Sequence, residues 1–170
     1  MKIVREPNVN ERPAQPYMGI RKRVPMSSLS KEVDKLFDAL DQWVGRNRVE
    51  TAGASFLRYH VIDMAGYMDI EAGVPVKAHL ADDGDVRAGV LPAGRYASLI
   101  YTGGGIAGNK ALIVWAKANG LAWDRWDDPH GDAFGARYET VLTDSKVEPR
   151  KTRWEIEVAI KLASDPSAAD

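Results

Sequence analysis

One carboxylate among strand-forming residues near the C-terminus has the clearest potential for chemistry. Glu139 lies in the segment 137–144, and the segment 154–162 that follows alternates apolar and charged residues. Such alternation predicts a half-buried strand with Trp154 on its apolar side. If Glu139 points to the same side as Trp154, it lies in an aromatic pocket, where a desolvated acid must bind a cation, accept hydrogen bonds or transfer protons. Alternation by itself favours a solvent-facing Glu139.

Aromatic side chains are the second group that could contact a ligand. The tyrosines on predicted strands include Tyr59, Tyr67, Tyr96, Tyr101 and Tyr138. Trp123 and Trp126 lie in the loop predicted before Glu139. Most aromatic residues belong to a core, but a subset that lines a cavity would bind flat, apolar or cationic molecules. Each stacking or cation–π contact contributes on the order of 0.5 to 2 kcal/mol.

Motifs for cofactors and metals are incomplete in this chain. The run 103–108 satisfies G-x-G-x-x-G, but no second parallel strand with a ribose-binding acid follows it, so we interpret the run as a strand-to-helix turn. The three histidines are scattered without ligand spacing, and the acidic segment 127–132 lacks the pattern of a calcium loop. We therefore expect neither a cofactor nor a metal.

Composition narrows the class of protein. The chain has 170 residues, with 23 basic and 24 acidic residues and a net charge of −1. This balance gives no electrostatic footprint for nucleic acid or for an anionic membrane. There is no cysteine, no apolar run of membrane-spanning length and no signal-peptide core at the N-terminus. We expect a cytoplasmic protein that binds neither nucleic acid directly nor membranes.

The first half of the chain predicts the order strand, helix, strand, strand. Pro7, Pro13 and Pro16, with polar residues between them, make residues 1–15 a poor element, except for a short strand at Ile3 and Val4. A strand over 17–24 follows, and a helix from Ser30 as N-cap to about residue 44 places apolar residues on one face. Strands over 54–62 and 67–76 flank a turn at 63–66.

The second half predicts the same order. A strand over 86–102 is broken at 91–94, a helix runs from residue 107 or 108 to 119, and two closing strands follow a loop over 121–135. The repeated order indicates an α+β fold built from two pseudo-symmetric units, with an antiparallel-rich sheet, both helices on one face and a ligand cleft between the halves.

These segments, in this order and spacing, resemble GyrI-like domains. The segments that carry the resemblance are Pro16–Arg21, Phe56–His60, Met68–Val76, Gly89–Tyr96, Tyr101–Gly103 and the strand from Tyr138 to Asp144, with its Tyr-Glu-x-x-Leu-Thr-Asp pattern and the final amphipathic strand. The resemblance spans roughly residues 15 to 162. It implies a single domain over 1–170 with an SHS2-type duplication, halves at about 15–76 and 86–162, and extensions at 1–14 and 163–170.

The resemblance also implies a function. GyrI-like domains occur as effector-binding domains of multidrug-sensing regulators of the AraC and MerR types, as stand-alone proteins including a gyrase inhibitor, and as hydrolases of cyclopropane-bearing toxins. We expect a stand-alone member that binds a hydrophobic or cationic small molecule. The alternatives are a hydrolase with Glu139 as catalytic acid or base, and an inhibitor that binds a protein partner.

The resemblance reverses the orientation that alternation favours for Glu139, because the family places a functional glutamate at the matching position. It implies ligand contacts by Glu139, Trp154, Tyr101 and Tyr59. Further candidates for contact are Phe56, Met68, Trp123 and Trp126. The chain departs from the family at 103–106, where Gly-Gly-Gly-Ile replaces a common Gly-Pro-Tyr and removes an aromatic wall.

Overall fold

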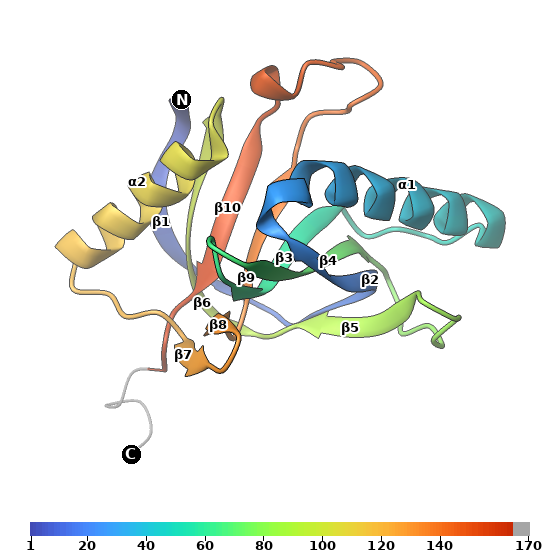
Figure 1. Ribbon diagram of the computed structural model, residues 1–170, viewed down its shortest axis with the longest axis horizontal. Helices are drawn as coiled ribbons and strands as arrows, with labels where there is room; N and C mark the ends of the chain where they lie inside the picture. The colour runs from blue at the N-terminus through green and yellow to red at the C-terminus, as the bar shows by residue number, and fades with distance from the viewer. Residues whose placement is uncertain (165–170) are drawn as a thin grey trace.

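The computed structural model describes residues 1–164 and contains both predicted units (Figure 1). The first unit consists of β2 (Gln15–Pro25), the 3-10 turn η1 (Met26–Ser28), α1 (Leu29–Asn47), β3 (Phe56–Ile62) and β4 (Tyr67–Pro75). The second consists of β6 (Gly94–Thr102), α2 (Gly105–Ala118), β9 (Arg137–Val141), the 3-10 turn η2 (Lys151–Arg153) and β10 (Ile156–Lys161). The remaining strands are β1 (Lys2–Arg12), β5 (Arg87–Leu91), β7 (Arg125–Asp128) and β8 (Gly131–Phe134).

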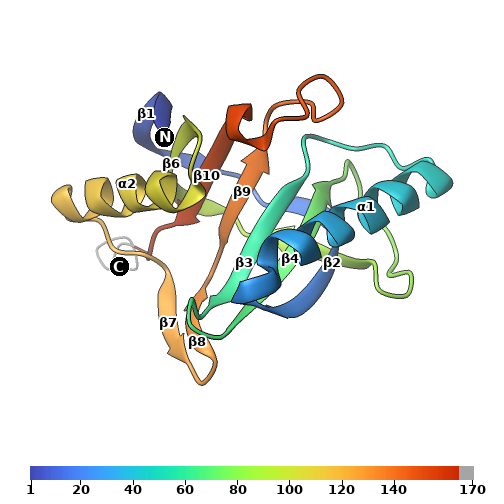
Figure 2. The same ribbon diagram turned by 45° about the horizontal axis from the view of Figure 1, so that its top comes forward.

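The strands form one antiparallel sheet in the order β1-β6-β10-β9-β3-β4-β2-β5, with the β7–β8 hairpin attached to β3. The two units meet at the central pair β9–β3. On each side of this pair the last strand of a unit, β10 or β4, comes next, and the first strand of that unit, β6 or β2, follows. Both helices lie over the same face of the sheet (Figure 2). The predicted α+β fold with a duplicated unit is confirmed.

Each helix covers its own half of the sheet. The apolar face predicted for α1 packs on the first half, where Leu36, Leu40 and Trp43 are buried. The buried residues Leu112 and Ala116 of α2 face the second half. The α1 helix begins at Leu29, so the expected N-cap at Ser30 is wrong and Ser28 takes that position, without a side-chain capping bond. Two separate helix cores leave the central strands open between them.

The N-terminal segment is a long strand, which corrects the expectation of a poor element over residues 1–15. β1 pairs along its length with β6 at one edge of the sheet. An edge strand tolerates proline because one of its sides makes no ladder bonds. Pro7 falls within a register shift between Arg5 and Asn8, where a bulge leaves a residue unpaired.

The predicted break at 91–94 is present, and it sends β5 and β6 to different halves of the sheet. β5 pairs with β2, whereas β6 pairs with β1 and β10. Arg12 is opposite Gly94 and Gln15 is opposite Leu91, so the β1–β2 and β5–β6 connections run side by side. Pro13 and Pro92 lie in these connections and have no N–H to continue the ladder. The result is a bent two-stranded ribbon, residues 12–15 and 91–94, across the sheet face opposite the helices.

The predicted loop over 121–135 contains the β7–β8 hairpin, which is a second correction. Its two strands have only four residues each, and β7 is mostly charged, so the pair lacks the extended apolar alternation that identifies a strand. The hairpin exists because β8 adds to β3 at Val61 and Ile62. Within residues 1–164, the side chains form no group of ligands that could hold a metal ion. Neither helix in that range combines the length and apolarity needed to cross a bilayer. The expected C-terminal extension at 163–170 lies mostly outside the described residues.

Candidate functional site

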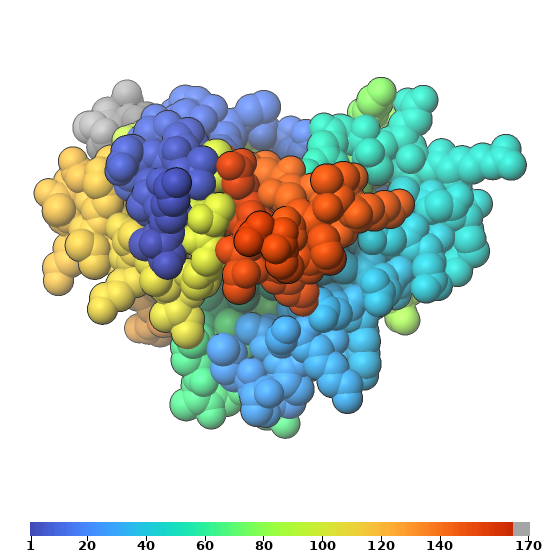
Figure 3. All heavy atoms as spheres, turned by 90° about the horizontal axis from the view of Figure 1, so that it is seen from above, coloured from blue at the N-terminus to red at the C-terminus, as the bar shows by residue number. Residues whose placement is uncertain are grey.

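A cavity of about 680 Å³ lies on the helix face of the sheet, between α1, the central strands and the β9–β10 connection. From above, this connection (orange-red) lies between α2 (yellow) and α1 (light blue) (Figure 3). The apolar and aromatic lining consists of Val33, Phe37, Leu57, Tyr59, Val141, Trp154 and Ile156. This volume falls within the range of roughly 300 to 1,000 Å³ that is typical of small-molecule sites.

The central strands place Glu139 at this cavity. Successive strand residues point to opposite faces, so Leu57 and Tyr59 of β3 share one face with Glu139 and Val141 of β9. Leu57 is directly opposite Glu139 in the β3–β9 ladder. All four side chains line the cavity. Glu139 therefore lies on the helix face, half-buried at the junction of the two units.

Both oxygens of Glu139 accept hydrogen bonds from neutral groups. Tyr101 Oη donates to Oε2 at 2.7 Å, and Asn109 Nδ2 donates to Oε1 at 3.4 Å. Tyr59 is adjacent, and burial together with the charge of Glu139 raises the pKa of Tyr59 well above its ordinary value. Within residues 1–164, no lysine or arginine forms an ion pair with Glu139. The carboxylate is thus held in place without being neutralised.

The glycine run before α2 makes room for Tyr101. A Cβ at Gly108 would lie 2.6 Å from the Tyr101 ring, and a Cβ at Gly105 would lie 3.3 Å from its hydroxyl. Gly103 has φ +88°, which other residues rarely adopt. Tyr101 is fully buried, and burial followed by the charge of Glu139 raises the pKa of its hydroxyl. The motif interpreted as a strand-to-helix turn therefore lets Tyr101 reach Glu139.

An arginine lies one step behind the carboxylate. Arg137 Nη2 donates to Asn109 Oδ1 at 2.9 Å, and its guanidinium lies 4.8 Å from the ring centre of Phe134. Burial lowers the pKa of Arg137, although the charge of Glu139 opposes that shift. Asn109 thus connects Arg137 to Glu139 and fixes the position of both.

The mouth of the cavity is acidic. The lining contains five carboxylates, those of Asp34, Asp38, Asp41, Glu139 and Asp144, and one ammonium group, that of Lys151. Burial, followed by the nearby charge of Asp38, raises the pKa of Asp41. Lys151 Nζ pairs with Asp34 at 2.6 Å and lies 5.9 Å from the centre of the Trp154 ring. The site therefore has an excess of negative charge.

Trp154 forms one wall from the end of the η2 turn, just before β10 begins. Its Nε1 donates to the carbonyl oxygen of Glu148 at 2.6 Å, which ties the ring to the β9–β10 connection. The expected strand begins two residues later than its predicted start, at Ile156. Val158 and Ile160 follow on the predicted apolar side and are fully buried.

The predicted contact residues divide into two groups. Glu139, Trp154 and Tyr59 line the cavity. Tyr101 is outside the lining but donates a hydrogen bond to Glu139. The other four lie outside it: Phe56 faces the opposite side of the sheet, Met68 is in the core under α1, Trp123 packs against the core under α2, and Trp126 is 50% exposed on β7.

The three aspartates that α1 contributes to the cavity lining are not predicted from the sequence. Asp34, Asp38 and Asp41 flank Phe37 at helical spacing, and such residues on a predicted helix are ordinarily solvated. The signal that could identify them is the spacing i, i+4, i+7, which places three like charges along one side of the apolar face.

Comparison with solved structures shows the same fold. The chain superimposes on EcmrR in its DNA complex with a TM-score of 0.71 and 18% identity, covering 94% of this chain and 58% of that one. The C-terminal domain of EcmrR gives a TM-score of 0.67 and 16% identity, with 96% of this chain and all of the domain covered. SAV2435 bound to tetraphenylphosphonium gives 0.60 and 10%, with 94% of both chains covered.

Sequence comparison identifies the family. No curated protein matches the chain significantly. The model of the GyrI-like small molecule binding domain, however, matches residues 5–162. The chain therefore belongs to the GyrI-like small-molecule-binding domain family.

Proposed function

We propose that the chain binds a hydrophobic organic cation in the cavity between α1 and the central strands, with Glu139 as the charged anchor. The main observation behind this proposal is which groups form hydrogen bonds and ion pairs with the Glu139 carboxylate. The carboxylate accepts hydrogen bonds from the neutral side chains of Tyr101 and Asn109, and it forms no direct ion pair with a lysine or arginine among the described residues, since Arg137 reaches it only through Asn109. A partly buried charge without a direct ion pair is costly, and a bound cation would relieve that cost.

The walls and the mouth support the same class of ligand. Tyr59, Phe37 and Trp154 provide aromatic faces, which attract cations as well as flat apolar groups. The acidic side chains at the mouth raise the local concentration of cations and repel anions. A lipophilic cation combines the apolar surface and the charge that this cavity complements.

Tetraphenylphosphonium is the appropriate first probe because it is a lipophilic cation. We expect saturable binding by calorimetry and by quenching of tryptophan fluorescence. Glu139→Gln removes the charge but keeps the shape, and we expect roughly tenfold or greater loss of affinity. Glu155→Gln is the matched control, because Glu155 is exposed and outside the cavity lining. Added salt should weaken binding to the wild-type chain.

The same variant separates the alternatives. Unchanged binding by Glu139→Gln would contradict the anchor role. Unchanged binding combined with lost hydrolysis of a cyclopropane-bearing electrophile would favour the hydrolase, because Glu139 would then act on the reaction rather than on binding. If no cation in a panel of aromatic cations binds, a protein partner becomes the better hypothesis.

A further inference from the structure

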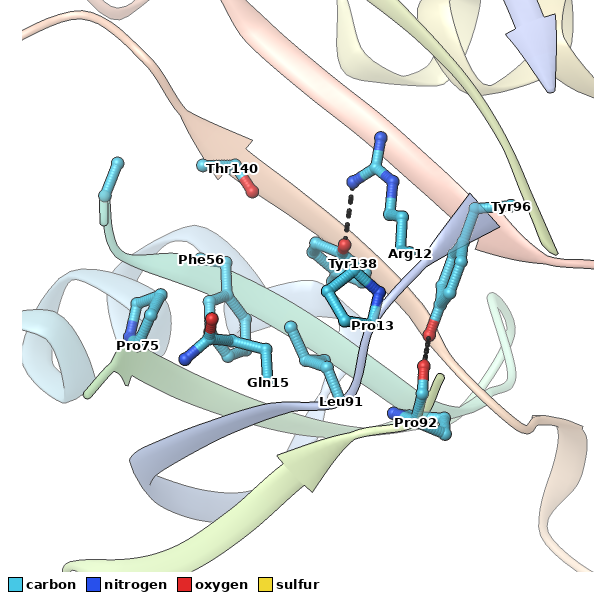
Figure 4. A pocket seen from close by; sticks show the side chains of 11 residues that line it. Arg12, Pro13, Gln15, Phe56, Pro75, Leu91, Pro92, Tyr96, Tyr138 and Thr140 are labelled. Atoms are coloured by element: carbon cyan, nitrogen blue, oxygen red, sulfur yellow. Dashed lines mark hydrogen bonds between the residues drawn. The ribbon is translucent and has the colours of Figure 1, made fainter. Parts of the chain in front are cut away.

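A second cavity, of about 270 Å³, lies on the opposite face of the sheet (Figure 4). One wall is the bent ribbon, which contributes Arg12, Pro13 and Leu91. The other wall is the central strand pair, which contributes Phe56 and Tyr138. The same strands thus line one cavity on each face, through alternate residues.

The walls of this second cavity are apolar and aromatic. The Phe56 and Tyr138 rings pack edge to face with their centres 5.5 Å apart, and Tyr96 lies 6.0 Å from Tyr138. Tyr96 is fixed by donating to the carbonyl oxygen of Pro92 at 2.6 Å, as Figure 4 shows. The volume is below the typical range for drug-sized ligands, so it fits a molecule with a single ring.

One end of the cavity presents hydrogen-bond donors. Arg12 Nη1 donates to Tyr138 Oη at 2.8 Å, so the Tyr138 hydroxyl acts as an acceptor in that contact and its own proton remains free. In the described part of the chain, neither the Tyr138 proton nor the hydroxyl of Thr140 has a side-chain or backbone acceptor. Both hydroxyls belong to the cavity lining, and these donors favour an anionic oxygen.

The charge at this end is positive. Arg12 pairs with Glu157 at 2.9 Å, and Arg5 pairs with the same carboxylate at 3.1 Å. Two guanidinium groups share one carboxylate, so the cluster retains one positive charge. Guanidinium groups bind carboxylates with strong, oriented hydrogen bonds.

We propose that the second cavity binds a small aromatic monocarboxylate, with its ring against Phe56 and Leu91 and its carboxylate toward Arg12, Tyr138 and Thr140. The sign of the charge distinguishes this ligand from the cation proposed for the helix face. The inference is independent of the proposed function, because it uses none of the residues of the first cavity.

Benzoate and its neutral counterpart benzamide test the proposal. We expect benzoate to shift the backbone amide resonances of Gln15 and Thr140 in ¹H–¹⁵N spectra, with those of Phe37 and Asp41, which line the first cavity from α1, moving less. Benzamide should bind more weakly. Arg12→Gln should weaken benzoate binding roughly tenfold or more. Arg95→Gln, which removes an exposed charge outside the cavity from β6, should not.

Arg12→Gln removes one of the two ion-pair partners of Glu157 and could destabilise the fold, so a second variant is needed as an independent test. Ala54 is an exposed residue of the cavity lining, so Ala54→Phe should fill the opening and abolish benzoate binding without changing any charge. Three results would overturn the proposal: equal affinity for benzoate and benzamide, unchanged benzoate binding by Ala54→Phe, or shifts confined to the cavity on the helix face.

Discussion

The two faces of the sheet differ in the hydrogen-bond and ion-pair partners of their carboxylates. On the helix face, Glu139 accepts hydrogen bonds from two neutral side chains, Tyr101 and Asn109. On the opposite face, Glu157 is paired with two arginines. Glu71, also on that face, bonds His60 Nε2 at 2.8 Å and accepts from Tyr17 Oη at 2.6 Å.

The difference suggests a criterion for separating structural acids from acids that could bind a ligand. A carboxylate paired with cationic side chains of the same chain connects strands, and its negative charge is already balanced without a ligand. A carboxylate held only by neutral donors is oriented but keeps its charge. The contacts therefore support the binding role that we propose for Glu139 and indicate a structural role for Glu71 and Glu157, although all three lie on the same sheet.

Among the substitutions considered, replacement of Glu71 should have the largest effect on stability. Burial by itself would raise the pKa of Glu71, but the hydrogen bonds from His60 and Tyr17, with the charges of His60 and Arg58, lower it below the ordinary value. We expect Glu71→Gln to reduce the free energy of unfolding at neutral pH by about 1 to 3 kcal/mol. Urea denaturation measures this loss.

The pH dependence checks the cause. Because the folded-state pKa of Glu71 is lowered, its stabilising contribution is fully present above the ordinary glutamate pKa and is lost as the pH falls through the folded-state pKa. The difference in stability between wild type and Glu71→Gln should therefore shrink on acidification below about pH 4. A difference that is constant with pH would contradict a charge-based role. Glu155→Gln serves as the exposed control.

A smaller loss of stability is expected for Gly108→Ala, at the point where α2 packs against the Tyr101 ring. Gly108→Ala places a Cβ 2.6 Å from the Tyr101 ring, and overpacking of this kind costs about 1 to 3 kcal/mol. Alanine in a helix gains roughly 0.5 to 1 kcal/mol over glycine, so the net change should be destabilising. The displaced Tyr101 should also release Glu139 and weaken cation binding. Thermal unfolding and tetraphenylphosphonium titration measure the two consequences.

Gly45→Ala in α1 is the matched control. A Cβ there would meet no atom within 4 Å, so the same substitution should stabilise the chain and leave cation binding unchanged. If both variants behave alike, then contact with Tyr101 is not the reason for glycine at position 108.

Most of the fold could be predicted from the sequence, because local patterns determine it. The apolar face of α1 and the alternation of β10 assign both elements and their buried sides. The strand β1 could not be predicted in this way, since its Pro7 looks disruptive until the edge position and the register shift are known. The β7–β8 hairpin is similarly defined by pairing with β3, which is a non-local contact.

The site was only partly predictable for the same reason. The alternation that places Trp154 on the apolar side says nothing of Tyr101, whose contact with Glu139 depends on the packing of β6 against α2. Phe56 shows the same limit, because it is an aromatic strand residue adjacent to Leu57 of the cavity lining, yet its side chain lies on the other face of the sheet. A strand pattern gives two faces, and only the tertiary structure shows which face meets which helix.

The smallest expected effect concerns Lys151, the one cationic residue of the acidic cavity lining among residues 1–164. Its ammonium group lies near Asp34 and the Trp154 ring, where a cationic ligand would also find an acid and an aromatic face. Lys151→Met should therefore increase the affinity for tetraphenylphosphonium. Both members of the ion pair are about half exposed, with 52% and 55% exposure, so the pair contributes at most about 1 kcal/mol and the gain in affinity should be no more than roughly fivefold.

Lys35→Met is the control. Lys35 lies on α1 but outside the cavity lining, so this substitution should leave the affinity unchanged. Reduced affinity in Lys151→Met would mean that the lysine supports the Trp154 wall rather than competing with the ligand. In that case the acidic residues at the mouth would contribute little to cation binding. The difference in ligand charge between the two faces would then depend on Glu139, which forms no direct ion pair among the described residues.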